Sequence, residues 1–75
     1  MTNDLAILIS RLFDPNTPIE ELRRVTSLLA SCEEPEALHA LRVFSDSEDA
    51  KKIKDLKYAV EECYFWNLVA AERNR

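Results

Sequence analysis

Apolar residues recur along this chain at the three- and four-residue spacing that places them on one face of an α-helix. The clearest run follows Thr17 and Pro18 and consists of Ile19, Leu22, Val25, Leu28, Leu29 and Cys32. Thr17 as N-cap, Pro18 at the first helical position and Glu20 three residues after Thr17 match a capping box, in which side chains satisfy backbone N–H groups. The pattern therefore predicts an amphipathic helix that begins here.

Two shorter helices are predicted on either side of this one. The first spans about Asp4 to Phe13 and ends at Asp14-Pro15, because the residue before a proline avoids helical geometry. The other begins at Pro35, and its apolar residues are Ala37, Leu38, Leu41 and Phe44. All three helices present one apolar face, as helices that pack on one another do.

A long fourth helix is predicted from about Glu48 to Glu72, with either Ser45 or Ser47 as its N-cap. Its first turns are rich in charge, and three i, i+4 pairs of opposite sign occur there: Glu48/Lys52, Lys51/Asp55 and Lys57/Glu61. Lys51, Lys52, Lys54 and Lys57 form a basic cluster, but the acidic residues between them indicate a solvated helical face rather than a nucleic-acid site.

The chain partly repeats itself after 31 residues. The matched pairs are Ala6/Ala37, Ile7/Leu38, Arg11/Arg42, Leu12/Val43, Phe13/Phe44, Leu22/Ile53, Val25/Leu56, Leu29/Val60 and Cys32/Cys63. Any two amphipathic helices share some of these matches through their common period, but the Arg, Phe and Cys pairs exceed that expectation. A repeat of this length is typical of helix-pair solenoids.

The repeated segments resemble a bacterial HEAT-like helical repeat. The resemblance is carried by Pro35-Glu36-Ala37-Leu38, by Ser45 to Asp49, by Asp14-Pro15 and by Glu20 to Val25, and it covers about residues 5 to 63. The lysine-rich stretch 51–54 departs from the family, and two units are fewer than solenoids usually contain. The resemblance implies a stack of helices that contacts other proteins, and it implies no particular reaction.

Composition supports an all-α fold in one domain. The 75 residues include no glycine and three prolines, whereas β-rich folds rely on glycine in their turns. We expect a single helical domain over residues 1–75, built as two antiparallel helix pairs. Unit one covers about 5–32, unit two about 36–63, and the last helix extends to about 72. A domain this small buries a modest core, which favours support from a second chain.

Charge and hydropathy limit the classes of partner and the location that we expect for this chain. The formal net charge of −4 disfavours binding to phosphate backbones and to anionic membranes. No stretch approaches the length of about 20 apolar residues that a membrane span needs, and the N-terminal segment does not match a signal peptide. With two cysteines, too few for a disulfide framework, the expected location is the cytoplasm.

Few residues are suited to catalysis or to metal binding. His39 is the only histidine and forms one Glu-x-x-His motif with Glu36, while di-iron bundles need two such motifs and further carboxylates. Cys32 and Cys63 lie on apolar helix faces, where cysteine is usually structural. A Cys32–Cys63 disulfide is conceivable, though a reducing compartment disfavours it. We expect no catalytic, cofactor or metal site.

The fourth helix carries the candidate contact surface. One face, composed of Ile53, Leu56, Val60, Cys63, Tyr64, Asn67 and Ala71, is sufficient to cover the other helices. Tyr58, Phe65 and Val69 point nearly the opposite way, and Trp66 lies at their flank. Exposed aromatic residues of this kind mark partner sites. Two alternatives are that a neighbouring helix buries both faces, or that Asn67 fixes the register of a heptad-like helical dimer.

These patterns predict a non-enzymatic protein-interaction module that acts through Tyr58, Phe65, Trp66 and Val69, as a homodimer or on a larger protein. The alternative is a small acidic inhibitor or antitoxin-like protein that blocks a nucleic-acid-handling enzyme. Its charge would come from Glu33, Glu34, Glu36, Asp46, Glu48 and Asp49.

Overall fold

The computed structural model describes residues 3–74 as four α-helices and one short 3-10 helix. The α-helices are α1 (Asn3–Leu12), α2 (Ile19–Ala30), α3 (Pro35–Ser45) and α4 (Leu56–Arg73), and the 3-10 helix η1 (Glu48–Lys52) precedes α4. No strand occurs in this range, so the predicted all-α class with a long last helix is confirmed. Residues 1, 2 and 75 of the predicted domain lie outside the described residues.

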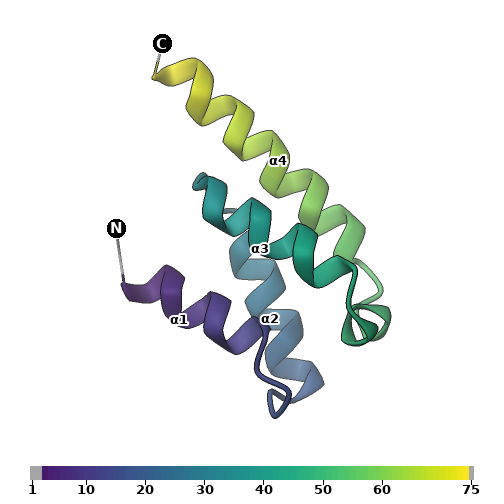
Figure 1. The fold of residues 1–75 in the computed structure, drawn as a ribbon. Coiled ribbons are helices and arrows are strands. Elements are labelled where there is room, and N and C mark those ends of the chain that lie inside the picture. The colour runs from purple at the N-terminus through teal and green to yellow at the C-terminus, as the bar shows by residue number, and fades with distance from the viewer. Residues whose placement is uncertain (1–2, 75) are drawn as a thin grey trace.

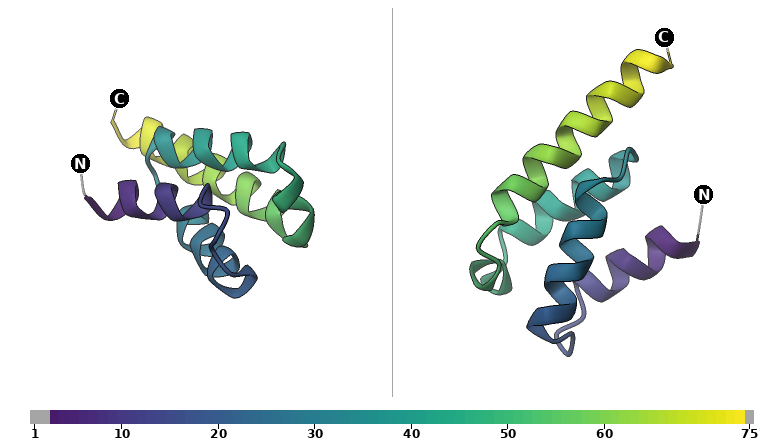
Figure 2. Two further views of the ribbon diagram at one scale, coloured as in Figure 1. Left: turned by 60° about the horizontal axis from the view of Figure 1, so that its bottom comes forward. Right: turned by 180° about the vertical axis from the view of Figure 1, so that it is seen from behind.

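Successive helices run in roughly opposite directions and form two layers (Figure 1). Seen from behind, α2 and α4 lie in front of α3 and α1 (Figure 2, right). α2 and α3 each contact the other three α-helices, so they form the centre of the molecule. The molecule measures 40 × 25 × 17 Å, and the last turns of α4 extend beyond the start of α3 and the end of α2 (Figure 1).

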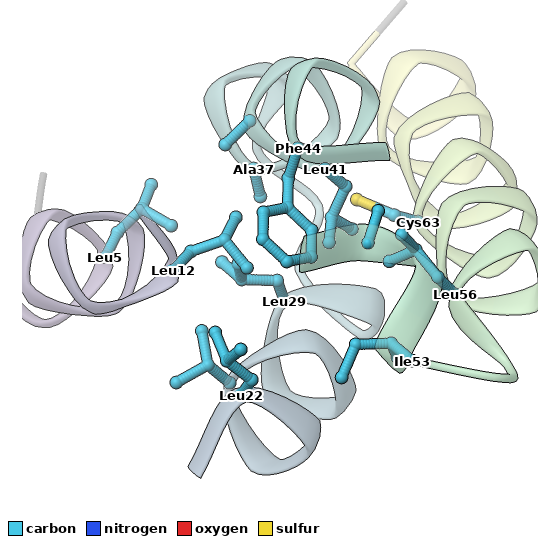
Figure 3. Close-up of a cluster of buried hydrophobic side chains, with 13 residues drawn as sticks. Leu5, Leu12, Leu22, Leu29, Ala37, Leu41, Phe44, Ile53, Leu56 and Cys63 are labelled. Atoms are coloured by element: carbon cyan, nitrogen blue, oxygen red, sulfur yellow. The ribbon is translucent and has the colours of Figure 1, made fainter. Parts of the chain in front are cut away.

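The core lies between the two layers and draws on every helix (Figure 3). Leu29, Ala37, Leu41 and Cys63 have no exposed surface, and they lie where α2, α3 and α4 meet. The other buried apolar residues of the cluster are Leu5, Leu12, Leu22, Val25, Ala40, Phe44, Ala50, Ile53 and Leu56. The apolar faces predicted for the second and third helices therefore do supply the core, apart from Ile19 and Leu28, which are exposed.

The predicted capping box at Thr17 is wrong. Pro18 is the N-cap of α2, and no side chain caps this helix. The Thr17 hydroxyl instead donates to the backbone oxygen of Arg11 over 2.8 Å. That oxygen lies in the last turn of α1, where carbonyls have no intrahelical partner, so Thr17 closes the preceding helix rather than opening the next.

The predicted continuous helix from Glu48 to Glu72 is also wrong. Ser47 is the cap of η1 and its hydroxyl accepts from the Ala50 N–H, which decides between the two predicted serines. Ile53 then adopts an extended backbone and is buried, and α4 begins at Leu56. A 3-10 helix has three residues per turn, so its ion pairs are Lys51–Glu48 and Lys52–Asp49 at i, i+3 instead of the predicted i, i+4 pairs.

Burial follows the 31-residue register in the second half of each predicted unit, for two of its pairs. Leu22, Val25, Ile53 and Leu56 are all buried. In the first helices, buried Leu12 corresponds to buried Phe44, which is a spacing of 32, and Phe13 is 46% exposed. α1 ends at Leu12, so Phe13 lies outside the helix and places its ring edge-to-face on Phe44, with 6.1 Å between centroids.

Candidate functional site: the outer strip of α4

α4 is the least buried of the long helices. Of its eighteen residues, only Leu56 and Cys63 are buried. Tyr58 is 59% exposed and Phe65 is 54% exposed, and their positions in the sequence place them on the side away from Cys63. No helix in the described range covers these two rings, so the alternative of a helix that buries both faces of α4 is wrong.

Trp66 and Val69, the other two predicted contact residues, are half-buried. The Trp66 ring packs edge-to-face on Phe65, with 5.4 Å between centroids. Its indole N–H donates to the Glu62 carboxylate over 3.4 Å. Trp66 therefore lies at the flank of the exposed face, as predicted, and holds the Phe65 ring in place from one side.

The sequence pattern missed Leu68, which is 48% exposed. It follows Phe65 by three residues, a spacing that places two side chains on the same helical face and that would have identified it. We call Tyr58, Phe65, Trp66, Leu68 and Val69 the outer strip of α4.

Two residues assigned to the core face are exposed instead. Tyr64 is 47% exposed and Ala71 is also exposed. Ala71 lies in the last turn of α4, which extends beyond the neighbouring helices (Figure 1), whereas Tyr64 directly follows the buried Cys63. The Arg42 guanidinium stacks over the Tyr64 ring, 5.5 Å from its centroid, and this contact takes the place of a buried environment.

A groove of about 510 Å³ runs between α2 and the first turns of α4. Tyr58 lines it and so joins the outer strip to α2. The remaining lining residues are Arg23, Thr26, Ser27, Ala30, Ile53, Lys54, Asp55, Ala59 and Glu62. Because Glu62 also accepts from Trp66, the far end of the groove meets the flank of the outer strip.

Both cysteines are free thiols; Cys63 is buried and Cys32 is half-buried. The pKa of Cys63 is raised to about 11, mainly by burial and then by the nearby Cys32. Burial and the charge of Glu34 also raise the pKa of Cys32. A thiol needs a lowered pKa to act as a nucleophile at neutral pH, so neither cysteine has the electrostatics of a catalytic one.

The single Glu-x-x-His motif lies on the surface. Glu36 and His39 line a second, mostly apolar groove of about 470 Å³ between α1 and α3, opposite Ile9 and Phe13. His39 is exposed. Within residues 3–74 no group of three or more His, Cys, Asp or Glu side chains is arranged to hold a metal ion.

The six carboxylates of the predicted acidic surface do not gather in one place. Glu33, Glu34 and Glu36 lie at the start of α3, and the other three follow its end, a separation of about 16 Å for eleven helical residues. Glu33 is paired with Arg73, Glu48 with Lys51 and Asp49 with Lys52. Half of the expected negative charge is thereby neutralised within the chain.

No protein-family model matches this chain, and neither a curated protein nor a solved structure is significantly similar to it. The HEAT-like resemblance stays a prediction. No helix in the described part of the chain has the length and hydropathy needed to cross a membrane.

Proposed function

We propose that this chain is a non-enzymatic protein-interaction module that binds a partner protein, or a second copy of itself, through the outer strip of α4. The observation that carries the proposal is the exposure of Phe65, at 54%, beside Leu68, at 48%, on a helix that extends beyond its neighbours. Contiguous exposed apolar surface of this kind marks interaction sites on soluble proteins.

The structure of α4 gives the strip the rigidity that an interface needs. The helix is held by Leu56 and Cys63 in the core and by the ion pair of Arg73 with Glu33 near its other end. The edge-to-face contact with Trp66 fixes the Phe65 ring before any partner arrives. Aromatic side chains that are already ordered lose little conformational freedom on binding, which favours their use as anchors.

The experiment compares two double variants that each remove two exposed, large apolar side chains. Phe65→Ala with Leu68→Ala removes two exposed side chains of the outer strip. Ile7→Ala with Leu28→Ala removes side chains of similar exposure, 48% and 47%, from α1 and α2. Alanine keeps the helices intact, which circular dichroism checks. We measure self-association by sedimentation velocity and partner capture from the native host.

The proposal requires that the strip variant loses the dimer or the captured partner, while the α1/α2 variant retains it. If both variants retain the same complex, or if both lose it equally, the outer strip is not the contact surface. A chain that stays monomeric at high concentration and captures no protein also contradicts the proposal.

A further inference from the structure

The Lys and Arg side chains of this chain differ in whether they contact an acidic or aromatic partner. Among residues 3–74, five Lys and Arg side chains form ion pairs: Arg11, Arg24, Lys51, Lys52 and Arg73. Arg42 and Lys57 lie over the rings of Tyr64 and Tyr58. Arg23 and Lys54 have neither kind of partner in the described range, and both are exposed. An acidic chain thus leaves two cations unpaired although carboxylates outnumber them.

Both unpaired cations line the same groove. Arg23 comes from α2 and Lys54 from the residues just before α4, so they line the groove from two segments, at the end where α4 begins. The Lys57 ammonium lies 5.3 Å from the centroid of the Tyr58 ring, and that ring lines the groove as well. Two cations therefore line one end of the groove, and a third lies over a ring that also lines it.

Two carboxylates also line the groove, one at each end. Asp55 lies at the end of Arg23 and Lys54, so the lining residues there carry two positive charges against one negative, on a chain whose net charge is −4. Glu62 lines the opposite end, where it accepts from Trp66. The groove is therefore positive where α4 begins and negative about two helical turns further on.

Small side chains line the middle of the groove. Ser27, Ala30 and Ala59 contribute small side chains between α2 and α4, which lie side by side (Figure 2, right). Small residues allow a third helix to lie close to the two backbones, with its side chains between theirs. From Arg23 to Ala30 the groove extends about 10 Å, which is two turns of helix.

We propose that the α2–α4 groove binds an acidic helical segment of a partner protein, whose carboxylates lie between Arg23 and Lys54. The inference rests on the proposed function, since it assumes that the chain acts by binding a protein, and it adds the chemistry of that partner. Arg–carboxylate contacts are directional and charge-assisted, so they fix the orientation of the bound helix. Tyr58 belongs to both the groove and the outer strip, so one partner can contact both.

The test uses a displayed library of random 16-residue peptides, selected against the full chain. We expect enriched peptides to carry clustered Asp and Glu and to bind more weakly as salt rises. Arg23→Ala with Lys54→Ala should weaken their binding by about tenfold or more. The matched control, Lys51→Ala with Lys52→Ala, removes the same charge from η1 and should leave binding within about twofold, a change of roughly 0.4 kcal/mol.

Two further variants separate a binding role from a structural one. Asp55→Asn removes the carboxylate at the positive end and should tighten peptide binding. Arg23→Glu with Lys54→Glu should reject the acidic peptides and accept versions in which Lys replaces their Asp and Glu. If Arg23 and Lys54 only stabilise the fold, the Lys-containing peptides do not bind the Glu double variant.

Three results would overturn the inference: no enriched peptide, enriched peptides without acidic residues, or peptides that bind the Arg23/Lys54 variant as they bind the natural chain. If peptides lose binding to the Phe65/Leu68 variant alone, the outer strip is the site and the groove is not. If selected peptides need the groove cations but not Phe65 and Leu68, the inference stands and the proposed role of the outer strip fails.

Discussion

The Cys63 thiol donates a hydrogen bond to the backbone oxygen of Cys32, with 3.5 Å between Sγ and O. Cys63 lies in the middle of α4, and Cys32 lies in the loop between α2 and α3, since α2 ends at Ala30. The Asn67 amide in turn donates to the Cys63 backbone oxygen over 2.9 Å and to its sulfur over 3.6 Å. This chain of contacts fastens the long helix to the loop just before it extends beyond the other helices.

The raised pKa of Cys63 predicts a loss of stability at high pH. The unfolded chain releases the thiol proton near pH 9, whereas the folded chain retains it up to about pH 11. The unfolded state therefore binds fewer protons in this interval, so the free energy of unfolding falls as pH rises from 9 to 11. Thermal unfolding measured from pH 8 to 11 should show a smaller decline for Cys63→Ser. An equal decline in both proteins would contradict this assignment.

The contact of Arg73 with Glu33 predicts local rather than global stabilisation. Both side chains are substantially exposed, at 59% and 40%, and exposed ion pairs contribute at most about 1 kcal/mol. Glu33→Gln should lower global stability only slightly, and it should speed amide exchange in the last two turns of α4. Glu20→Gln, an exposed carboxylate on α2, is the control. Unchanged exchange near Arg73 would mean that the ion pair does not hold this end.

The two hydrogen bonds of the Ser47 hydroxyl predict that its removal lowers the stability of the fold. Its hydroxyl accepts from the Ala50 N–H and donates to the Phe44 backbone oxygen, so it joins the end of α3 to the start of η1. Ser47→Ala should lower the free energy of unfolding by about 1 kcal/mol. Ser45→Ala removes an exposed hydroxyl that donates only to the Arg42 backbone oxygen, and should cost less. Chemical denaturation measures both, and equal losses would refute a capping role.

The edge-to-face contact of Phe13 with Phe44 predicts that substitutions of the two rings have non-additive effects on the free energy of unfolding. Phe44 is 2% exposed, so Phe44→Ala should cost about 3–5 kcal/mol, whereas Phe13→Ala removes a ring that is 46% exposed and should cost less. A double-mutant cycle should give a coupling of about 0.5–1.5 kcal/mol. A coupling near zero would show that the two rings contribute independently.

The sequence by itself determined the helices and most of the core. Pro15 and Pro35 mark the end of α1 and the start of α3, and a period near 3.6 identified Leu22, Val25, Leu29, Leu41 and Phe44 as inward-facing. These features are local, because a proline restricts its own neighbours and the helical period is a property of one segment. The same period placed Tyr58 and Phe65 away from the core, where both are exposed.

Only the tertiary structure decided how far that core extends and what surrounds each polar group. A helical period shows which residues share a face, but not where the neighbouring helices end. Ala71 therefore appeared to be a core residue, although it is exposed in the last turn of α4, which extends beyond the other helices. Ile53 interrupts the predicted last helix because its extended backbone allows the side chain to be buried. Arg23 and Lys54 lie 31 residues apart in the chain and line one groove only because α2 and α4 pack side by side.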